Sequence, residues 1–143
     1  MAYQNSITLK VSVLLIVLLG VEARDFSFFP HKTVIIRNDI SPHPTALDLI
    51  VHCKSKDDDL GFHTLAFGGT YSFEFRPLFS PKLGKTLFFC SFTWKGNANP
   101  HYLNVYNQDV DDCKVCNWKI NTTGGCNDFK GYEECRKWEA AFD

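Results

Sequence analysis

The chain has 143 residues, with 15 Lys and Arg against 16 Asp and Glu, so its formal net charge is −1 at neutral pH. Such a balance gives no bulk attraction to nucleic acid or anionic membranes, and it excludes the strongly basic classes of binding protein. Any partner is therefore expected to recognise a local pattern of side chains.

The first residues have the layout of a secretory signal peptide. One cation, Lys10, precedes the apolar run 11–21, and Ala23 ends the small-residue stretch before Arg24. The run is shorter than the roughly 20 apolar residues that a membrane-spanning helix needs. We therefore predict a signal peptide over 1–23 and a secreted, extracellular mature domain over 24–143, with no membrane insertion of the mature chain.

Alternation of apolar and polar residues predicts short β-strands along the mature chain. The expected strands are 33–38, 47–54, 62–67, 71–75, 87–94, 103–106 and 116–120. Turn signals rich in Gly and Pro separate them at 41–44, 68–69, 77–84, 96–100 and 124–125. The strand 87–94 is apolar on both faces, which predicts a central strand covered on both sides. The expected fold is all-β, a single-domain antiparallel β-sandwich of about seven to nine short strands.

Six cysteines are expected to form disulfides that staple the domain: Cys53, Cys90, Cys113, Cys116, Cys126 and Cys135. The sequence leaves their pairing open. The 113–116 spacing also matches a redox pair, and four C-terminal cysteines would suffice for zinc. Residues 117–120 have a strand pattern rather than the helix of a redox site, and a second close pair is missing, so structural disulfides are favoured. Because four cysteines lie within 113–135, we expect this part to be held by disulfides rather than by a core of its own.

The segment 51–61 runs from an apolar strand into a charged loop. His52 and His63 flank Asp57, Asp58 and Asp59, which raises the alternatives of acid–base catalysis and of a metal site. No nucleophile or orienting group can be placed beside the two histidines, and the three acids lack the alternating spacing of a calcium loop. We therefore expect no catalytic residue, no metal and no cofactor.

Two further patterns concern the surface and the core. Asn121 begins the only Asn-x-Ser/Thr sequon, next to a Gly-Gly turn signal, which predicts a glycan on Asn121. The strand aromatics lack the interleaved Lys and Arg of a nucleotide-stacking surface, so we expect them in the core. They are Tyr71, Phe73, Phe75, Phe88, Phe92, Trp94 and Trp118.

Five motifs occur in order along the mature chain: VHCKSKDDDLG over 51–61, His63-x-Leu65, Tyr71-x-Phe73-x-Phe75, TLFFC-x-F-x-W over 86–94 and Cys113-x-x-Cys116-x-Trp118-x-Ile120. Together they resemble the plant self-incompatibility S-protein homologue family. The resemblance implies a small secreted β-sandwich whose founding members act in the pistil as ligands, recognised by pollen and rejecting self pollen. The chain departs from the family pattern at Gln108-Asp109, where Arg-Asp is usual, and in the connection 77–85, which is longer than typical.

Two functional classes fit this sequence. The first is a monomeric, non-enzymatic ligand whose rigid loops bind a cell-surface receptor protein in cell–cell signalling or rejection of self pollen. The alternative is a secreted defence protein or small secreted hydrolase, for which the sequence shows neither a convergent polar site nor excess positive charge. The candidate partner-binding residues are Lys54, Lys56, Asp57, Asp58, Asp59, Asn97, Asn99 and His101. We expect 54–60 to be a common docking element, and 77–85 and 96–101 to govern partner choice.

Overall fold

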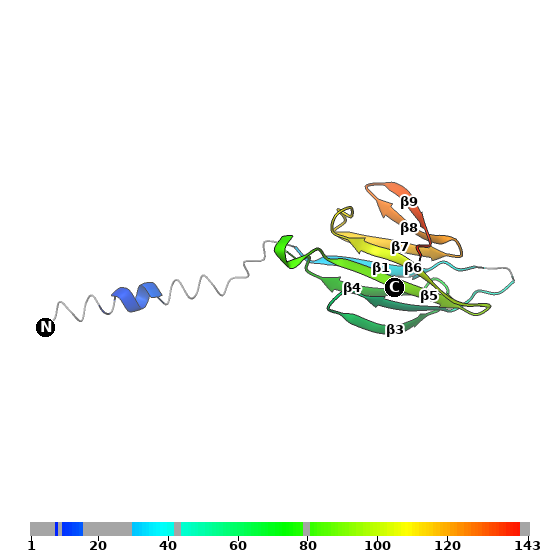
Figure 1. The fold of residues 1–143 in the computed structure, drawn as a ribbon, viewed down its shortest axis with the longest axis horizontal. Coiled ribbons are helices and arrows are strands. Elements are labelled where there is room, and N and C mark those ends of the chain that lie inside the picture. Colours follow the sequence, from blue (N-terminus) through cyan, green and yellow to red (C-terminus); the bar gives the residue numbers. More distant parts are fainter. Residues whose placement is uncertain (1–7, 9, 16–29, 42–43, 79–80, 141–143) are drawn as a thin grey trace.

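Two β-sheets pack face to face in the computed structural model, which describes residues 8, 10–15, 30–41, 44–78 and 81–140 (Figure 1). The described strands are β1 (Lys32–Asn38), β2 (Leu49–Lys54), β3 (Asp59–Leu65), β4 (Thr70–Phe75), β5 (Leu87–Trp94), β6 (Asn97–Asn107), β7 (Val115–Asn121), β8 (Gly124–Phe129) and β9 (Tyr132–Lys137), with a 3₁₀ helix, η1 (Pro81–Leu83), before β5. One sheet has the order β4-β1-β7-β8-β9 and the other β3-β2-β5-β6. The prediction of an all-β sandwich is confirmed.

Within the N-terminal segment, the described residues 10–15 take no part in the sandwich core. Residues 10–15 are helical, and the side chains of Val11, Val13, Leu14 and Leu15 are more than half exposed. None of the helices within the described residues is long and apolar enough to cross a membrane. The cleavage position predicted before Arg24 lies outside the described residues.

One strand pair departs from the expected antiparallel arrangement. β1 and β7 run parallel, in register from Thr33 opposite Val115 to Asn38 opposite Ile120. Both strands are interior to the five-stranded sheet, where parallel strands are usually found because they need cover. The pairing joins the beginning of the domain to its last third, which no local pattern in the sequence indicates.

The strand boundaries were predicted unevenly. β5 spans the residues expected for it, whereas β6 begins at Asn97, inside a predicted turn, and β8 and β9 were missed. The Gly124-Gly125 pair opens β8 instead of forming a turn. A Cβ atom on Gly125 would lie 2.6 Å from Leu103 Cδ2 and 3.1 Å from Trp118 Cε3, so glycine leaves room for the core at this position. The C-terminal part thus shares the common core through Cys116, Trp118 and Ile120 and carries two disulfides, in agreement with the expectation that it has no separate core of its own.

The core lies between the two sheets and consists mainly of alternating strand residues. Phe88, Cys90, Phe92 and Trp94 of β5 point inward and are at most 9% exposed. Trp118 and Phe92 are fully buried, while Tyr71, Phe73 and Phe75 pack at the margin of the core, as predicted for the aromatics. The outward residues of β5 are only half-buried, and no third layer of described residues covers them. The prediction of cover on both sides is wrong.

Two buried polar side chains join one sheet to the other. The Trp118 indole Nε1 donates to the carbonyl of Val105 on β6 at 2.8 Å. That carbonyl is available because the β5–β6 register shifts by one residue at this point, so Val105 and Tyr106 are both buried. Asn38, with no exposed area, donates to the Leu47 and Leu65 carbonyls at 2.7 and 2.9 Å.

All six cysteines form disulfides, as predicted: Cys53–Cys90, Cys113–Cys116 and Cys126–Cys135. Cys53 and Cys90 stand opposite each other on β2 and β5, and Cys126 and Cys135 do so on β8 and β9. Because every thiol is paired, none is available to bind zinc. The Cys113–Cys116 pair is buried and leads into a strand, so it lacks the exposed sulfur and helix of a redox site.

We expect Trp118→Phe to lower the free energy of unfolding by about 3 kcal/mol, because it leaves the buried Val105 carbonyl unpaired and opens a cavity. Trp138→Phe is the matched control. Its indole donates to the Thr122 carbonyl at 3.0 Å in an exposed position, so its loss should cost about 1 kcal/mol or less. Urea denaturation of both variants measures the difference, and equal losses would contradict the role assigned to the Trp118 bond.

Candidate functional site

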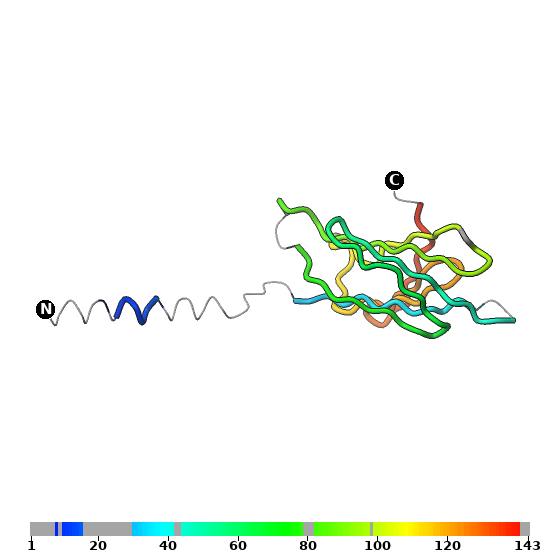
Figure 2. The backbone as a smooth tube through the Cα atoms, turned by 90° about the horizontal axis from the view of Figure 1, so that it is seen from below, coloured from blue at the N-terminus to red at the C-terminus, as the bar shows by residue number. Residues whose placement is uncertain are grey.

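Three connections meet at one end of the sandwich, which we call the loop end: residues 55–58, 76–86 and 107–112. The strand pairing places them together, because Lys54 of β2 pairs with Phe89 near the start of β5, and Leu87 pairs with Asn107 at the end of β6. The turn around Lys95 lies at the opposite end, as Figure 2 shows along the length of the molecule. The loop end therefore combines segments that are far apart in the sequence.

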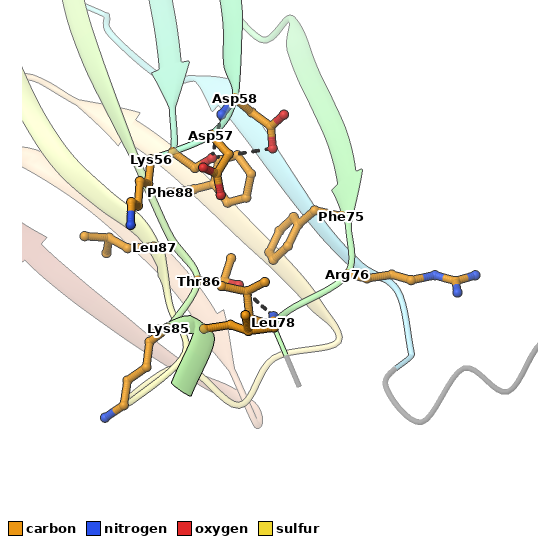
Figure 3. Close-up of a pocket in the computed structure, with 13 residues that line it drawn as sticks. Lys56, Asp57, Asp58, Phe75, Arg76, Leu78, Lys85, Thr86, Leu87 and Phe88 are labelled. Atoms are coloured by element: carbon orange, nitrogen blue, oxygen red, sulfur yellow. Dashed lines mark hydrogen bonds between the residues drawn. The ribbon is translucent and has the colours of Figure 1, made fainter. Parts of the chain in front are cut away.

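A cleft of about 230 Å³ opens at the loop end, between the turn 55–58 and the connection 76–86 (Figure 3). Its floor is apolar, and its rim carries charges of both signs. The lining residues are Ser55, Lys56, Asp57, Asp58, Phe75, Arg76, Leu78, Leu83, Gly84, Lys85, Thr86, Leu87 and Phe88. The structure thus brings the predicted docking element 54–60 against the connection 77–85, which was predicted to govern partner choice.

The turn 55–58 closes on itself directly beside a buried disulfide. The Ser55 amide donates to the Asp58 carbonyl at 2.8 Å, and the Asp58 amide donates to Ser55 Oγ at 3.1 Å. Lys54 precedes the turn as the last residue of β2, one position after Cys53, whose bond to Cys90 fixes the strand beneath. The side chains of Lys56, Asp57 and Asp58 are exposed on this anchored turn.

Asp59 begins β3 and forms most of the polar contacts of this hairpin. Its Oδ1 accepts from His52 Nε2 at 2.6 Å and from the Gly61 amide at 3.0 Å, and Oδ2 lies 3.7 Å from Lys54 Nζ. The His52 hydrogen bond, followed by the Gly61 bond, lowers the pKa of Asp59 below its ordinary value of 3.8. Asp59 is therefore occupied within its own hairpin, whereas no ion pair of the described residues involves Asp57 or Asp58.

The two histidines do not share a site. His52 lies on the outer face of the four-stranded sheet against Phe62, with ring centroids 4.0 Å apart. His63 pairs with inward-facing Val51 and stacks on Tyr71 across the edge of the sandwich, at 3.7 Å. Side chains on opposite faces of a sheet cannot act on one substrate group. Among the described residues, no three His, Cys, Asp or Glu side chains are grouped so that they could hold a metal ion.

Gln108 ties the connection 76–86 to the end of β6. Its side chain accepts from the Thr86 amide at 2.8 Å and donates to the Leu78 carbonyl at 2.8 Å. The Gln108 amide also donates to the Thr86 carbonyl at 3.0 Å, and the Leu78 amide donates to Thr86 Oγ1 at 2.9 Å. Lys85 of this connection also forms an ion pair with Asp109, the residue after Gln108. The Gln108-Asp109 pair, where the chain departs from the family pattern, thus holds the connection 76–86, which forms one wall of the cleft.

The segment 107–112 is anchored in turn to the core. Asp111 accepts from the Asn107 amide and from Arg136 Nη2, both at 2.7 Å, and the Asp111 side chain is only 5% exposed. Burial acts to lower the pKa of Arg136, but the hydrogen bond and the negative charge of Asp111 outweigh it, so this pKa is raised. The Arg136 guanidinium lies over the Trp118 ring at 5.1 Å. All three connections of the loop end are therefore attached to fixed structure.

The other predicted contact residues lie elsewhere. Asn97, Asn99 and His101 belong to β6 and not to a loop, towards the opposite end of the sandwich. The His101 ring is stacked between Trp94 and Trp138, with centroids 4.8 and 5.0 Å away, so a partner cannot reach its faces. The assignment of these three residues to a partner-binding loop is corrected accordingly.

Asn121 ends β7, also at the end opposite the cleft. Its Oδ1 accepts from the Thr123 amide, the Thr123 hydroxyl and the Gly124 amide at 2.8 to 3.1 Å. The sequon therefore occupies a tight turn on the surface, where Thr122 and Thr123 are exposed. A glycan on Asn121 remains a prediction, and it would leave the loop end uncovered.

The floor of the cleft was missed by the sequence analysis, which placed Phe75 and Phe88 only in the core. Both do pack there, at ring centroids 4.6 Å apart, but their rings also face the cleft. Gln108 was noted as a departure from the family pattern and as part of a polar loop over 107–112, but its hydrogen bonds to the connection 76–86 were not foreseen. The length of the 77–85 connection was the one available signal that a surface feature would form here.

We expect Gln108→Ala to release the connection 76–86 without unfolding the domain, because two side-chain hydrogen bonds are lost. The protection of the Thr86 amide against hydrogen exchange should fall about tenfold, since each such bond contributes roughly 0.5–1.5 kcal/mol. Asn99→Ala, a substitution at an exposed position of β6 far from this connection, should leave Thr86 protection unchanged. Unchanged protection in the Gln108 variant would show that the connection is held by other contacts.

The Asp59 carboxyl is expected to titrate below 3.8 in an NMR pH titration. Because the pKa of Asp59 is lower in the folded state than in the unfolded state, its contacts stabilise the hairpin at every pH above the unfolded-state pKa. This stabilisation is lost as the pH falls through the folded-state pKa. His52→Ala should move the titration midpoint upward, towards the ordinary value. A midpoint that His52→Ala leaves in place would disprove this origin of the shift.

The similarity of the chain to known proteins agrees with this architecture. S-protein homolog 29 of Arabidopsis thaliana is 34% identical over 143 residues, covering 96% of this chain and 99% of that protein. S-protein homolog 2 of the same plant is 39% identical over 124 residues, covering 78% and 72%. S-protein homolog 4 reaches 46% identity over 84 residues, about half of each chain. No solved structure matches the chain.

The family model of plant self-incompatibility protein S1 matches residues 33–138, from the second residue of β1 to the residue after β9. The match therefore includes both sheets, all six cysteines and the three connections of the loop end. The resemblance seen in the sequence motifs is confirmed over the whole sandwich. The chain belongs to the plant self-incompatibility protein S1 family, together with the S-protein homologues of Arabidopsis thaliana.

Proposed function

We propose that the protein is a secreted, non-enzymatic recognition ligand that a cell-surface receptor binds at the loop end. The observation that carries this proposal is the anchored convergence of the three connections, through Cys53–Cys90, Gln108 and Asp111. Loops that are already fixed lose little conformational entropy on binding, so a modest interface gives useful affinity. Recognition sites on small β-sandwiches commonly use such loops on a rigid scaffold.

Secretion is supported by two features of the chain. The helical segment 10–15 has exposed apolar side chains and takes no part in the core, which suits a targeting segment that is removed. Three disulfides in a domain of this size suit an oxidising compartment. The name of the matching family, plant self-incompatibility protein, favours pollen as the target cell and rejection of self pollen as the outcome.

We expect a glycan introduced at the loop end to block binding to target cells, because it covers the connections regardless of their charge. Val110→Asn with Asp112→Ser creates a sequon at two exposed positions and keeps Asp111. Lys95→Asn with Asn97→Thr adds a glycan at the opposite end as the matched control. Binding of fluorescent protein to living pollen, stigma and root cells should fall at least tenfold for the first variant and less than twofold for the second.

Mass spectrometry confirms that each variant carries its glycan. If the unmodified protein binds no cell type, the proposed function is wrong. If the control glycan blocks binding and the loop-end glycan does not, the receptor contacts the other end. Preferential binding to pollen supports the pollination role, whereas equal binding to root cells contradicts it.

A further inference from the structure

The size of the cleft limits what it can hold. Sites for drug-sized small molecules commonly enclose about 300–1,000 Å³, whereas this cleft measures about 230 Å³. It is open to solvent between two connections instead of being enclosed in the core (Figure 3). Those dimensions suit one long side chain of a partner protein better than a free metabolite.

The aromatic surface at the floor of the cleft comes mainly from half-buried Phe75, with Phe88 packed almost fully buried beside it. Phe88 is 3% exposed, and its ring centroid lies 4.6 Å from that of Phe75 at an angle of 45°. The Phe75 ring also packs against the Tyr106 ring in an edge arrangement, with the two ring centroids 4.8 Å apart. The faces of aromatic rings carry negative electrostatic potential and attract cations at short range. An apolar stem that ends in a positive charge therefore complements this floor.

The rim adds two carboxylates without ion-pair partners. Asp57 and Asp58 are exposed on the turn above the two phenylalanine rings (Figure 3). Their neighbour Asp59 already has two partners in the hairpin, the His52 ring at 2.6 Å and the Lys54 ammonium at 3.7 Å. The Asp58 carboxylate accepts one long hydrogen bond from the Ser55 hydroxyl, at 3.5 Å. Both carboxylates are thus free to accept hydrogen bonds from a positively charged group.

The cations that line the cleft are directed elsewhere or already paired. Lys85 forms its ion pair with Asp109, and Arg76 Nε donates to His31 at 2.9 Å. Both side chains point away from the cleft in Figure 3. Lys56 is the remaining cation of the lining, and it shares the turn with both free carboxylates. Arg76 keeps its positive charge, because its partner His31 is not an acid, but its guanidinium is directed away from the two phenylalanine rings. The turn above the rings carries the two negative charges of Asp57 and Asp58 and the one positive charge of Lys56.

We propose that the cleft binds a Lys or Arg side chain from a basic segment of the partner. The aliphatic stem lies on Phe75, Phe88 and Leu78, and the charged group is held by Asp57 and Asp58. Because the partner is the receptor of the proposed function, this inference rests on that function. In this arrangement the carboxylates of the turn 55–58 recognise the positive charge. The residues 83–86 that line the opposite wall determine which side chain fits.

The direct test uses the tripeptide acetyl-Gly-Arg-Gly-amide, titrated into ¹⁵N-labelled protein and followed by amide chemical shifts. We expect millimolar binding that shifts amides of 55–58 and 84–88. The peptide with citrulline, which has the shape of arginine without its charge, should bind at least fivefold more weakly. The same tripeptide with glutamate in place of arginine should bind more weakly still. The proposal is overturned if the arginine and citrulline peptides bind equally, if the glutamate peptide binds more tightly, or if the shifts are confined to other surfaces.

The variant Asp57→Asn/Asp58→Asn should weaken arginine-peptide binding at least fivefold. Asp39→Asn/Asp48→Asn removes the same charge from two exposed positions at the other end, so it should leave the affinity unchanged. Urea denaturation establishes that both variants are folded. Equal affinities of the two variants would contradict a role for the rim carboxylates.

Cell binding separates this inference from the proposed function. If the loop-end glycan blocks cell binding but Asp57→Asn/Asp58→Asn leaves it unchanged, the receptor uses the loop end without a basic segment, and this inference alone is wrong. If the unmodified protein binds no cell, the proposed function is wrong, and peptide titration still decides the chemistry of the cleft. A matching fivefold loss in both measurements supports the inference.

Discussion

The hydrogen bond from the Trp118 indole to the Val105 carbonyl connects the two sheets where the loop end begins. The register shift in β6 removes this carbonyl from the strand ladder, and a buried carbonyl without a donor costs about 1–3 kcal/mol. Two residues later β6 ends at Asn107, whose amide bonds to Asp111. Arg136 lies over Trp118 and holds Asp111 from the other side. One buried ring therefore determines where the segment 107–112 leaves the core.

From that point the loop end is assembled by successive attachments. Gln108 positions the connection 76–86 through its amide group, and the Cys53–Cys90 bond fixes the base of the turn 55–58. The cleft lies between these two attached elements, so its width is determined by the sandwich and not by the binding partner. Side chains on the rim can differ without altering the scaffold, because the attachments use backbone groups, buried residues and a disulfide. Such separation of scaffold and rim lets the surface of the loop end vary while the fold is kept.

The sequence predicted what depends on local pattern and missed what depends on register. β5 was predicted at its exact bounds because it is a continuous run of apolar and β-branched residues without a break. β6 was shortened because Pro100 indicates a turn, yet β6 is an edge strand, where a missing amide donor is tolerated. Gly125 was wrongly assigned to a turn. A glycine is needed there because any side chain would collide with the buried Trp118 ring, and the sequence pattern does not show that contact. The charged turn 55–58 was found as a candidate, but Phe75 and Gln108 join it only through the pairing of distant strands.

The parallel pairing of β1 and β7 also determines the order in which the domain can be completed. β1 obtains its first neighbour from β4, but its other edge stays open until residues 115–121 are available. Parallel pairs of such sequence separation form late, because a long loop must close before any contact compensates for its entropy. Until then Val34 and Ile36 border an unpaired edge, which is a template for association with other chains. A chain cut short before β7 would thus be an aggregation-prone fragment rather than a smaller folded domain.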